Sequence, residues 1–246
     1  MARVISILYW LAAALIAFAM FPIALVVWAL TLPFDRRKVV LHALTNVWGS
    51  LYTWINPLWS VQVEGREHID GRAPYMMVSN HLSLVDIFVV HRLFCHYKWV
   101  SKIEIFRMPL IGWNMRLAGY IPLRRGDRHS VVEMLDRCRV ALERGSSVMM
   151  FPEGTRSRTG QLKEFKPGAF ELARDVAVAV LPMVIQGTAT ALPKKGLTVS
   201  RARMRVTVLP PIPKAEVEAS TVEQLRDRAR GQIAAFVEAN PWPVEP

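Results

Sequence analysis

A histidine and an aspartate stand five positions apart in residues 79–86, which read SNHLSLVD. On an ideal helix this separation would turn the two side chains about 140° away from one another. They can meet only if the chain turns between them. We expect such a turn because His81 follows the apolar run YMMV, a short buried strand, and precedes Ser83, a suitable N-cap residue. In a helix capped by Ser83, Asp86 occupies the third position and completes an S-x-x-D capping box.

A histidine held by a carboxylate is the arrangement of a general base. The carboxylate of Asp86 would fix the tautomer of His81 and stabilise its protonated form, which leaves the second ring nitrogen to accept a proton. The structural alternative is that Asp86 only caps the helix and His81 only occupies a loop. The pair by itself does not decide between these two interpretations.

A second segment, FPEGTRS at 151–157, directly follows the buried strand SVMM. Pro152 and Gly154 shape a turn whose backbone N–H groups can face an anion. Arg156 adds a planar, permanently charged group suited to phosphate. Glu153 is unexpected beside an anion unless it binds hydroxyl groups or orients an arginine. The alternative is an ordinary polar loop.

Further basic residues follow other predicted strands. The segment GYIPLRR at 119–125 ends in two arginines, and we take Arg125 as a candidate phosphate ligand. Lys102 in SKIE and Lys166 in FKPGA are additional candidates, and Thr155 joins the substrate-binding candidates of its turn. A basic surface turn is the alternative for the arginine segment.

The elements that must position these residues alternate between strand and helix. Such alternation predicts an α/β fold with a mainly parallel sheet flanked by helices. Ligands of such sheets bind outside the carboxyl ends of the strands, where the candidate residues stand. We expect strands at 59–65, 75–79, 98–101, 120–123, 147–151, 176–185 and 203–209, and helices at 83–94, from about 102 to 115, and at 130–144, 168–174 and 221–239.

The amino-terminal region is apolar. Residues 4–34 carry no charged side chain, and roughly 20 apolar residues suffice to cross a bilayer. Residues 39–59 carry aromatic side chains typical of the membrane interface. We predict a helical hairpin around 35–38 that either spans the bilayer or lies in one leaflet, with residues 1–58 as the membrane anchor and 59–246 as the α/β domain. A cleaved signal peptide is the alternative, but the apolar run is longer than the usual 7–15 residues.

The formal net charge of +11 favours partners that carry negative charge. Nucleic acid, an anionic membrane surface and phosphate-bearing substrates all fit. Nucleic acid is disfavoured because the soluble part shows no recognised binding motif and no interleaving of aromatic with basic residues. Cys95 and Cys138 have no metal-type spacing and are expected to be free thiols in a reducing compartment. The basic cluster at 36–38 favours a cytoplasmic position for the hairpin connection.

Taken together, these segments resemble the glycerolipid acyltransferases, specifically the bacterial 1-acylglycerol-3-phosphate acyltransferases. The family's H-x-x-x-x-D block appears as NHLSLVD, its arginine-bearing second block as GYIPLRR, its third as FPEGTRS and its proline-containing fourth as VLPM. The resemblance covers residues 59–209, and the family also has an amino-terminal hydrophobic hairpin. The second block departs from the pattern at Pro122 and Arg124, where many members carry other residues.

The resemblance implies an O-acyltransferase of phospholipid synthesis. The enzyme would move a fatty acyl group from acyl-CoA or acyl carrier protein to the sn-2 hydroxyl of membrane-borne 1-acylglycerol-3-phosphate (lysophosphatidic acid), giving phosphatidic acid. The resemblance implies no metal or other cofactor, and a location at the bacterial cytoplasmic (inner) membrane with the active site facing the cytoplasm. Two alternatives stay open: another lyso-lipid acceptor, such as a lyso-ornithine lipid, and a non-catalytic membrane protein that binds anionic lipid.

The resemblance also implies roles for the candidate residues. His81 would deprotonate the acceptor hydroxyl, with Asp86 as its orienting partner. Arg125 and Arg156 would bind the acceptor phosphate, while Glu153 and Gly154 would shape the glycerol site. No G-x-S-x-G segment is present, so we expect direct transfer without an acyl-serine intermediate.

Overall fold

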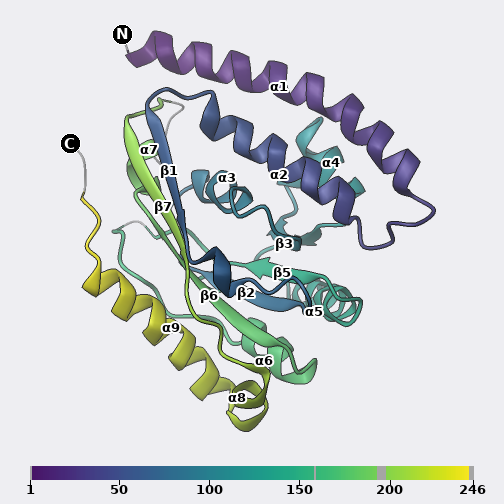
Figure 1. The fold of residues 1–246 in the computed structure, drawn as a ribbon, viewed down its shortest axis with the longest axis vertical. Coiled ribbons are helices and arrows are strands. Elements are labelled where there is room, and N and C mark those ends of the chain that lie inside the picture. Colours follow the sequence, from purple (N-terminus) through teal and green to yellow (C-terminus); the bar gives the residue numbers. More distant parts are fainter. Residues whose placement is uncertain (1, 158, 193–197, 244–246) are drawn as a thin grey trace.

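The centre of the molecule is a seven-stranded sheet with strand order β1-β7-β6-β2-β5-β3-β4 (Figure 1). The computed structural model describes the chain except residues 1, 158, 193–197 and 244–246. Neighbouring strands run parallel except β6 and β7, which are antiparallel. The strands are β1 Trp59–Glu64, β2 Tyr75–Ser79, β3 Tyr97–Lys102, β4 Ile121–Leu123, β5 Ser147–Met150, β6 Ala179–Gln186 and β7 Ala202–Val208. The predicted mainly parallel α/β fold is confirmed.

Helices cover both faces of the sheet and enclose a separate apolar core on each (Figure 1). One face carries α1 Ala2–Thr31, α2 Val39–Trp54, α3 Val85–His91 and α4 Ile111–Leu117. The other carries α5 Arg128–Glu143, α6 Gly168–Asp175, α8 Lys214–Ala219 and α9 Val222–Ala239. Three short helices, η1 Arg66–His68, η2 Ile105–Arg107 and α7 Thr188–Ala191, lie in the connections.

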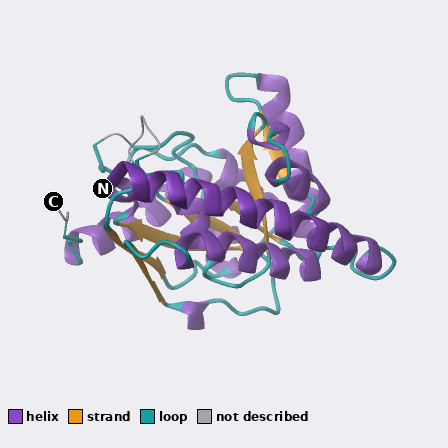
Figure 2. Ribbon diagram, turned by 90° about the horizontal axis from the view of Figure 1, so that it is seen from above, coloured by secondary structure: helices purple, strands orange, loops and turns teal. Residues whose placement is uncertain are grey.

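The first two helices form the predicted hairpin, and α1 lies across the top of the molecule (Figure 2). By length and composition α1 can cross a membrane. Apolar side chains remain exposed along it: Val4, Ile7, Leu8, Leu11, Leu15, Phe18, Ile23, Leu25, Val26 and Leu30. Such a continuous exposed apolar face indicates contact with lipid.

The second helix differs from the first because it packs against the sheet layer. It contacts α3 and buries polar side chains: His42, Thr45, Asn46, Ser50 and Thr53. It is therefore both one arm of the hairpin and part of the cover of the sheet. The division of the chain into residues 1–58 and 59–246 stays a prediction.

The helix after β2 is shorter than predicted. It begins at Val85 with Leu84 as its N-cap residue, and it ends at His91 instead of reaching residue 94. The predicted capping box is only half present: the carboxylate of Asp86 accepts the N–H of Ser83, but the Ser83 hydroxyl accepts from Val85. Asp86 thereby holds residues 82–83 in the loop, outside the first helical turn. At the other end Phe94 has a positive φ of 52°, which is incompatible with continuing the helix.

Candidate active site

His81 and Asp86 meet where the loop after β2 turns into α3. Nδ1 of His81 lies 2.7 Å from Oδ2 of Asp86, so the predicted contact between the two side chains is present. Asp86 is fully buried, and His81 is 8% exposed. Because the carboxylate engages Nδ1, the Nε2 atom is the ring nitrogen left for a substrate, and no hydrogen bond to it comes from the described residues. The pair has the geometry of a general base with its orienting carboxylate.

The carboxylate of Asp86 is fixed by three further donors. Its Oδ2 atom accepts the backbone N–H of Leu82 at 2.7 Å and of Ser83 at 3.0 Å. Its Oδ1 atom accepts the hydroxyl of Thr188, the first residue of α7. A carboxylate held by several hydrogen bonds cannot rotate away from its histidine. Thr188 was not predicted from the sequence, where only its position just after the apolar strand β6 marks it.

Glu153 connects the two predicted motif loops. Its Oε1 atom accepts the backbone N–H of His81 at 2.8 Å, and the backbone N–H of Ser157 donates to the His81 carbonyl, also at 2.8 Å. Glu153 is 5% exposed, and this burial raises its pKa above the usual value for a glutamate. We expected this side chain in the glycerol site. That role stays a prediction, and in the structure the carboxylate holds the backbone of the proposed base.

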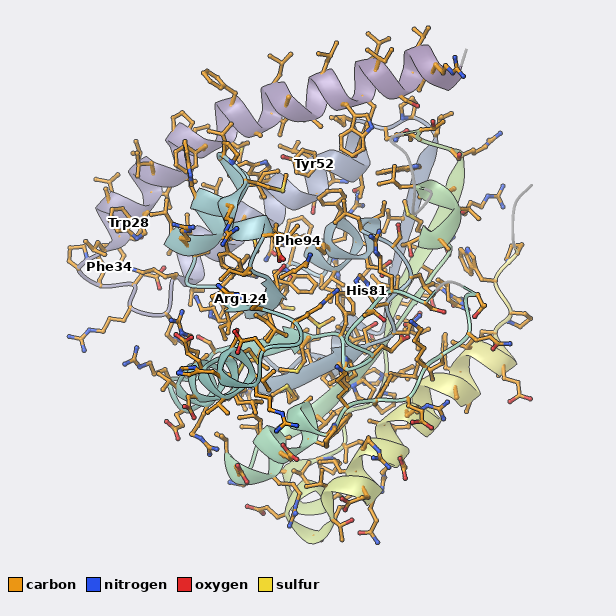
Figure 3. The ribbon with its side chains drawn as sticks, turned by 180° about the vertical axis from the view of Figure 1, so that it is seen from behind. Trp28, Phe34, Tyr52, His81, Phe94 and Arg124 are labelled. Carbon is orange, nitrogen blue, oxygen red and sulfur yellow. The ribbon has the colours of Figure 1, made fainter. Side chains whose placement is uncertain are left out.

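The imidazole of His81 is stacked on an aromatic ring. The ring of Phe151 lies parallel to it, with 4.0 Å between centroids and 6° between planes. The ring of Phe151 in turn packs against that of Trp99, with 5.6 Å between the ring centroids. The stack fixes the plane of the histidine ring, and Asp86 fixes its rotation within that plane. Figure 3 shows His81 in the middle of the molecule.

A cavity of about 430 Å³ adjoins this stack and gathers most of the predicted phosphate ligands. Phe151 forms part of its wall, and five candidate substrate-binding residues line it: Lys102, Arg125, Gly154, Thr155 and Lys166. The lining contains three cations and one acid, Glu171. This balance favours an anionic ligand such as phosphate.

The two candidate arginines lie near one another without sharing the cavity wall. Partial burial lowers the pKa of Arg125, and the charge of Arg156 lowers it further. Arg156 itself is not among the lining residues. Two neighbouring cations repel one another, so an anion bound at Arg125 would relieve an existing repulsion. Lys102 is exposed and paired with Glu104 at 3.2 Å, so its charge already has a partner.

The backbone conformation at position 154 requires a glycine. Its φ is +71°, and a Cβ atom there would lie 3.0 Å from Cε of Lys166. The backbone N–H of Lys166 also donates to the carbonyl of Pro152. The glycine therefore permits the tight turn and lets the lysine side chain pass close to it.

A second, apolar cavity of about 180 Å³ lies beneath α1, among α2, α3 and α4. Trp99 lines it, as does Ser101, which also lines the basic cavity. The shared residue places an apolar space next to a basic one. An acyl chain requires an apolar space of this kind.

Metal-ligating groups do not cluster in the part of the chain that the structure describes: no set of three or more His, Cys, Asp or Glu side chains there could hold an ion.

Comparison with known proteins identifies the family. A family model described as Acyltransferase matches residues 60–186, slightly more than half of the chain. The chain belongs to the acyltransferase family. The match includes His81, Asp86 and every other candidate site residue from the sequence, whereas Thr188 lies just outside it.

Relatives with curated names support this family. The chloroplastic 1-acyl-sn-glycerol-3-phosphate acyltransferase LPAT1 of Arabidopsis thaliana is 38% identical over 202 residues, which are 81% of this chain and 54% of that protein. A 1-acyl-sn-glycerol-3-phosphate acyltransferase of Chlamydomonas reinhardtii is 33% identical over 237 residues, 96% of this chain and 70% of that protein. The chain thus spans little more than half the length of the Arabidopsis relative.

The fold has a close structural counterpart. The crystal structure of the 1-acyl-sn-glycerophosphate acyltransferase PlsC from Thermotoga maritima matches with a TM-score of 0.78 and 23% identity. The match covers 99% of this acyltransferase-family chain and all of PlsC. It shows that the whole chain, including the amino-terminal helices, adopts a known architecture.

Proposed function

We propose that this protein transfers a fatty acyl group from a thioester donor to the sn-2 hydroxyl of 1-acylglycerol-3-phosphate, giving phosphatidic acid. The observation that carries this proposal is the contact between His81 and Asp86 beside a basic cavity that adjoins an apolar one. An acceptor with a phosphate and an acyl chain matches that combination. The names of the relatives from plants and algae point to the same acceptor.

The reaction balances with the residues present. Nε2 of His81 takes the proton of the acceptor hydroxyl while the hydroxyl oxygen attacks the thioester carbonyl. The tetrahedral intermediate collapses by breaking the C–S bond, and the departing thiolate recovers the proton from the imidazolium. Asp86 stabilises that imidazolium and stays ionised. The thioester of acyl-CoA or acyl carrier protein supplies the driving force. The steps proposed use the two substrates, His81 and Asp86, without a metal or further cofactor.

Binding would divide between the two cavities. Arg125 and Lys166 hold the acceptor phosphate in the basic cavity, and the apolar cavity takes the end of an acyl chain. The exposed face of α1 places the protein on the membrane where the acceptor resides. We assign it to the bacterial inner membrane with the site towards the cytoplasm, because basic residues 36–38 favour the cytoplasmic side.

The test is transfer of a labelled acyl group to a panel of acceptors in detergent or vesicles. Acyl-CoA and acyl carrier protein donors are each offered 1-acylglycerol-3-phosphate, a lyso-phospholipid with a substituted phosphate, and a lyso-ornithine lipid. We expect labelled phosphatidic acid as the main product. Transfer to the lyso-ornithine lipid alone would reassign the acceptor, and no transfer to any acceptor would overturn the proposal.

The arginines provide a test of the phosphate site. Arg125→Ala should raise KM for the acceptor by about tenfold or more with little change in KM for the donor, since a charge-assisted contact contributes about 1.5–3 kcal/mol. Arg156→Ala should have the same direction and a smaller effect, because this residue does not line the cavity. Equal increases for donor and acceptor would contradict the assignment of either residue to the phosphate.

A further inference from the structure

A larger basic cavity, of about 680 Å³, lies along the open edge of the sheet at β4. We call it the edge cavity. Its walls come from the connection between α1 and α2, the end of α4, and α5, which lie on the same side of the molecule (Figure 1). Seven cations line it: Arg36, Arg37, Lys38, Lys98, Arg116, Arg137 and Arg144. Asp136 is the acidic residue of the lining.

Most of these cations lack a compensating partner. Arg137 pairs with Glu133, and Arg37 donates to the carbonyl of Gly145. The side chains of four others form no hydrogen bond or ion pair with any residue that the structure describes: Arg36, Lys38, Arg116 and Arg144. Surface cations are usually interspersed with acids, so such an excess in one cavity points to an anion that is bound there.

Lys98 is the buried member of this group. It is 6% exposed, and its Nζ atom donates to the carbonyls of Arg37 at 2.7 Å and Ala118 at 2.6 Å. These two acceptors leave the third N–H without a partner among the described residues. The nearby carboxylate of Asp35 is already occupied by the N–H groups of Val39 and Val40. Lys98 thus ties the hairpin connection to α4 and keeps one donor for a ligand.

The surroundings of the edge cavity indicate where such an anion comes from. Next to the basic residues 36–38 stand exposed apolar side chains, Leu32 at 48%, Phe34 at 72% and Val40 at 47%. Phe34 lies at the tip of the hairpin, on the side of the molecule that carries α5 (Figure 3). Together with the exposed face of α1, these residues give lipid tails an apolar surface beside a basic cavity. Basic residues adjoining a membrane-seated apolar segment bind anionic headgroups.

We propose that the edge cavity binds the phosphate of an anionic membrane phospholipid, at a site separate from the catalytic centre. Lys98 and Gly119 of the edge cavity stand at the amino ends of β3 and β4. Lys102 and Arg125 line the basic cavity beside His81, here called the catalytic cavity, and stand at the carboxyl ends of the same strands. The bound lipid fixes the tip of the hairpin at the headgroup level and so sets the orientation of the catalytic face. This binding does not depend on the reaction proposed above.

The test is a titration of the full chain, in an uncharged detergent, with fluorescent phosphatidylglycerol or fluorescent phosphatidylcholine. One variant carries Arg36→Gln, Arg116→Gln and Arg144→Gln. A control of equal charge carries Arg72→Gln, Arg174→Gln and Arg228→Gln, three exposed arginines outside the edge cavity. Arg125→Ala reports on the catalytic cavity. Circular dichroism and Tm verify that each variant is folded.

We expect the edge-cavity variant to weaken phosphatidylglycerol binding by at least about tenfold, and the control by less than about threefold. Phosphatidylcholine binding should change in neither. Equal losses in both triple variants would reduce the effect to overall charge and overturn the proposal. Loss in Arg125→Ala would place the lipid in the catalytic cavity, which also overturns it. Displacement of the lipid by millimolar glycerol 3-phosphate would assign the site to a soluble phosphate and overturn the membrane source.

Discussion

Two groups of histidines in this protein differ in their partners, although all are buried except the half-buried His96. His81 is held by the carboxylate of Asp86. Three others, His42 on α2, His91 on α3 and His96 just before β3, lie close together and form hydrogen bonds only to neutral groups. His42 bonds to the Cys95 carbonyl and the Tyr120 hydroxyl. His91 bonds to the Asn46 amide oxygen and the Tyr97 hydroxyl, and His96 bonds to the Ser146 hydroxyl.

The partners decide what each ring can do. Burial lowers the pKa of His91 to about 3, and burial together with the charges of Lys98 and Arg37 lowers that of His96 to about 4, so both rings stay neutral at physiological pH. His91 joins α3 to α2 through Asn46 and to β3 through Tyr97, whereas His96 bonds to Ser146 just before β5. His81 has an anion to stabilise its charged form and a ring nitrogen free for substrate. The comparison teaches that burial alone does not make a histidine catalytic.

The largest expected effect separates the two groups directly. His81→Gln should lower the rate of acyl transfer by about 10³-fold, because general-base catalysis contributes typically 10²–10⁴-fold. His96→Gln, measured per folded protein, should stay within about threefold of the wild type, because His96 lines neither the apolar nor the basic cavity. The measurement is labelled phosphatidic acid formed at saturating donor. Similar losses in the two variants would remove the distinction between the groups.

The loss of folding stability at low pH should depend on His91 and His96, the histidines whose rings are neutral in the folded protein. His91 has an unfolded pKa near 6.5 and a folded pKa of about 3, so below pH 6.5 the unfolded chain binds a proton that the folded chain refuses. Stability is therefore complete above pH 6.5 and is lost as the pH falls towards 3, by about 1.4 kcal/mol per pH unit for this group. His96 adds a similar loss down to about pH 4.

Denaturant unfolding in detergent at pH 7, 6 and 5 measures this slope. In His91→Gln the slope should fall by about 1.4 kcal/mol per pH unit relative to the wild type. An unchanged slope would show that His91 takes up a proton as readily in the folded protein as in the unfolded chain, which would contradict its lowered pKa.

The smallest effect concerns the third residue of the catalytic arrangement. Thr188→Val removes the hydroxyl that donates to Oδ1 of Asp86 while preserving the shape of the side chain. We expect the rate of acyl transfer to fall by about tenfold with unchanged KM values, since a hydrogen bond to a charged group contributes about 1.5–3 kcal/mol. Thr188→Ser is the matched control because it keeps the hydroxyl, and it should retain most of the activity. A serine variant as slow as the valine variant would assign Thr188 to packing.

The sequence predicted the features that depend on local order along the chain. His81 and Asp86 are five residues apart, so one turn suffices to bring them together. The alternation of strands and helices predicted the mainly parallel sheet, and Pro122 is tolerated in β4 because β4 is an edge strand. The apolar run predicted α1 within a few residues of its actual ends.

The remaining features depend on contacts between distant segments. Thr188 is 102 residues from Asp86, and Glu153 is 72 residues from the His81 backbone that it holds. No pattern of residue types fixes which acid meets which backbone N–H across a sheet. The start of α3 was misplaced for a related reason: Asp86 also accepts the N–H of Leu82 and contacts His81 and Thr188, so its carboxylate holds the loop as well as the N–H of Ser83. The buried polar face of α2 shows only once α3 packs against it.

The most direct test of the central claim is the rate of acyl transfer to 1-acylglycerol-3-phosphate in a double-variant cycle of His81→Gln and Asp86→Asn. If Asp86 acts only through His81, the double variant should be no slower than His81→Gln alone, because the carboxylate has nothing left to orient. Multiplying losses in the double variant would contradict the claim, since Asp86 would then serve catalysis independently of His81.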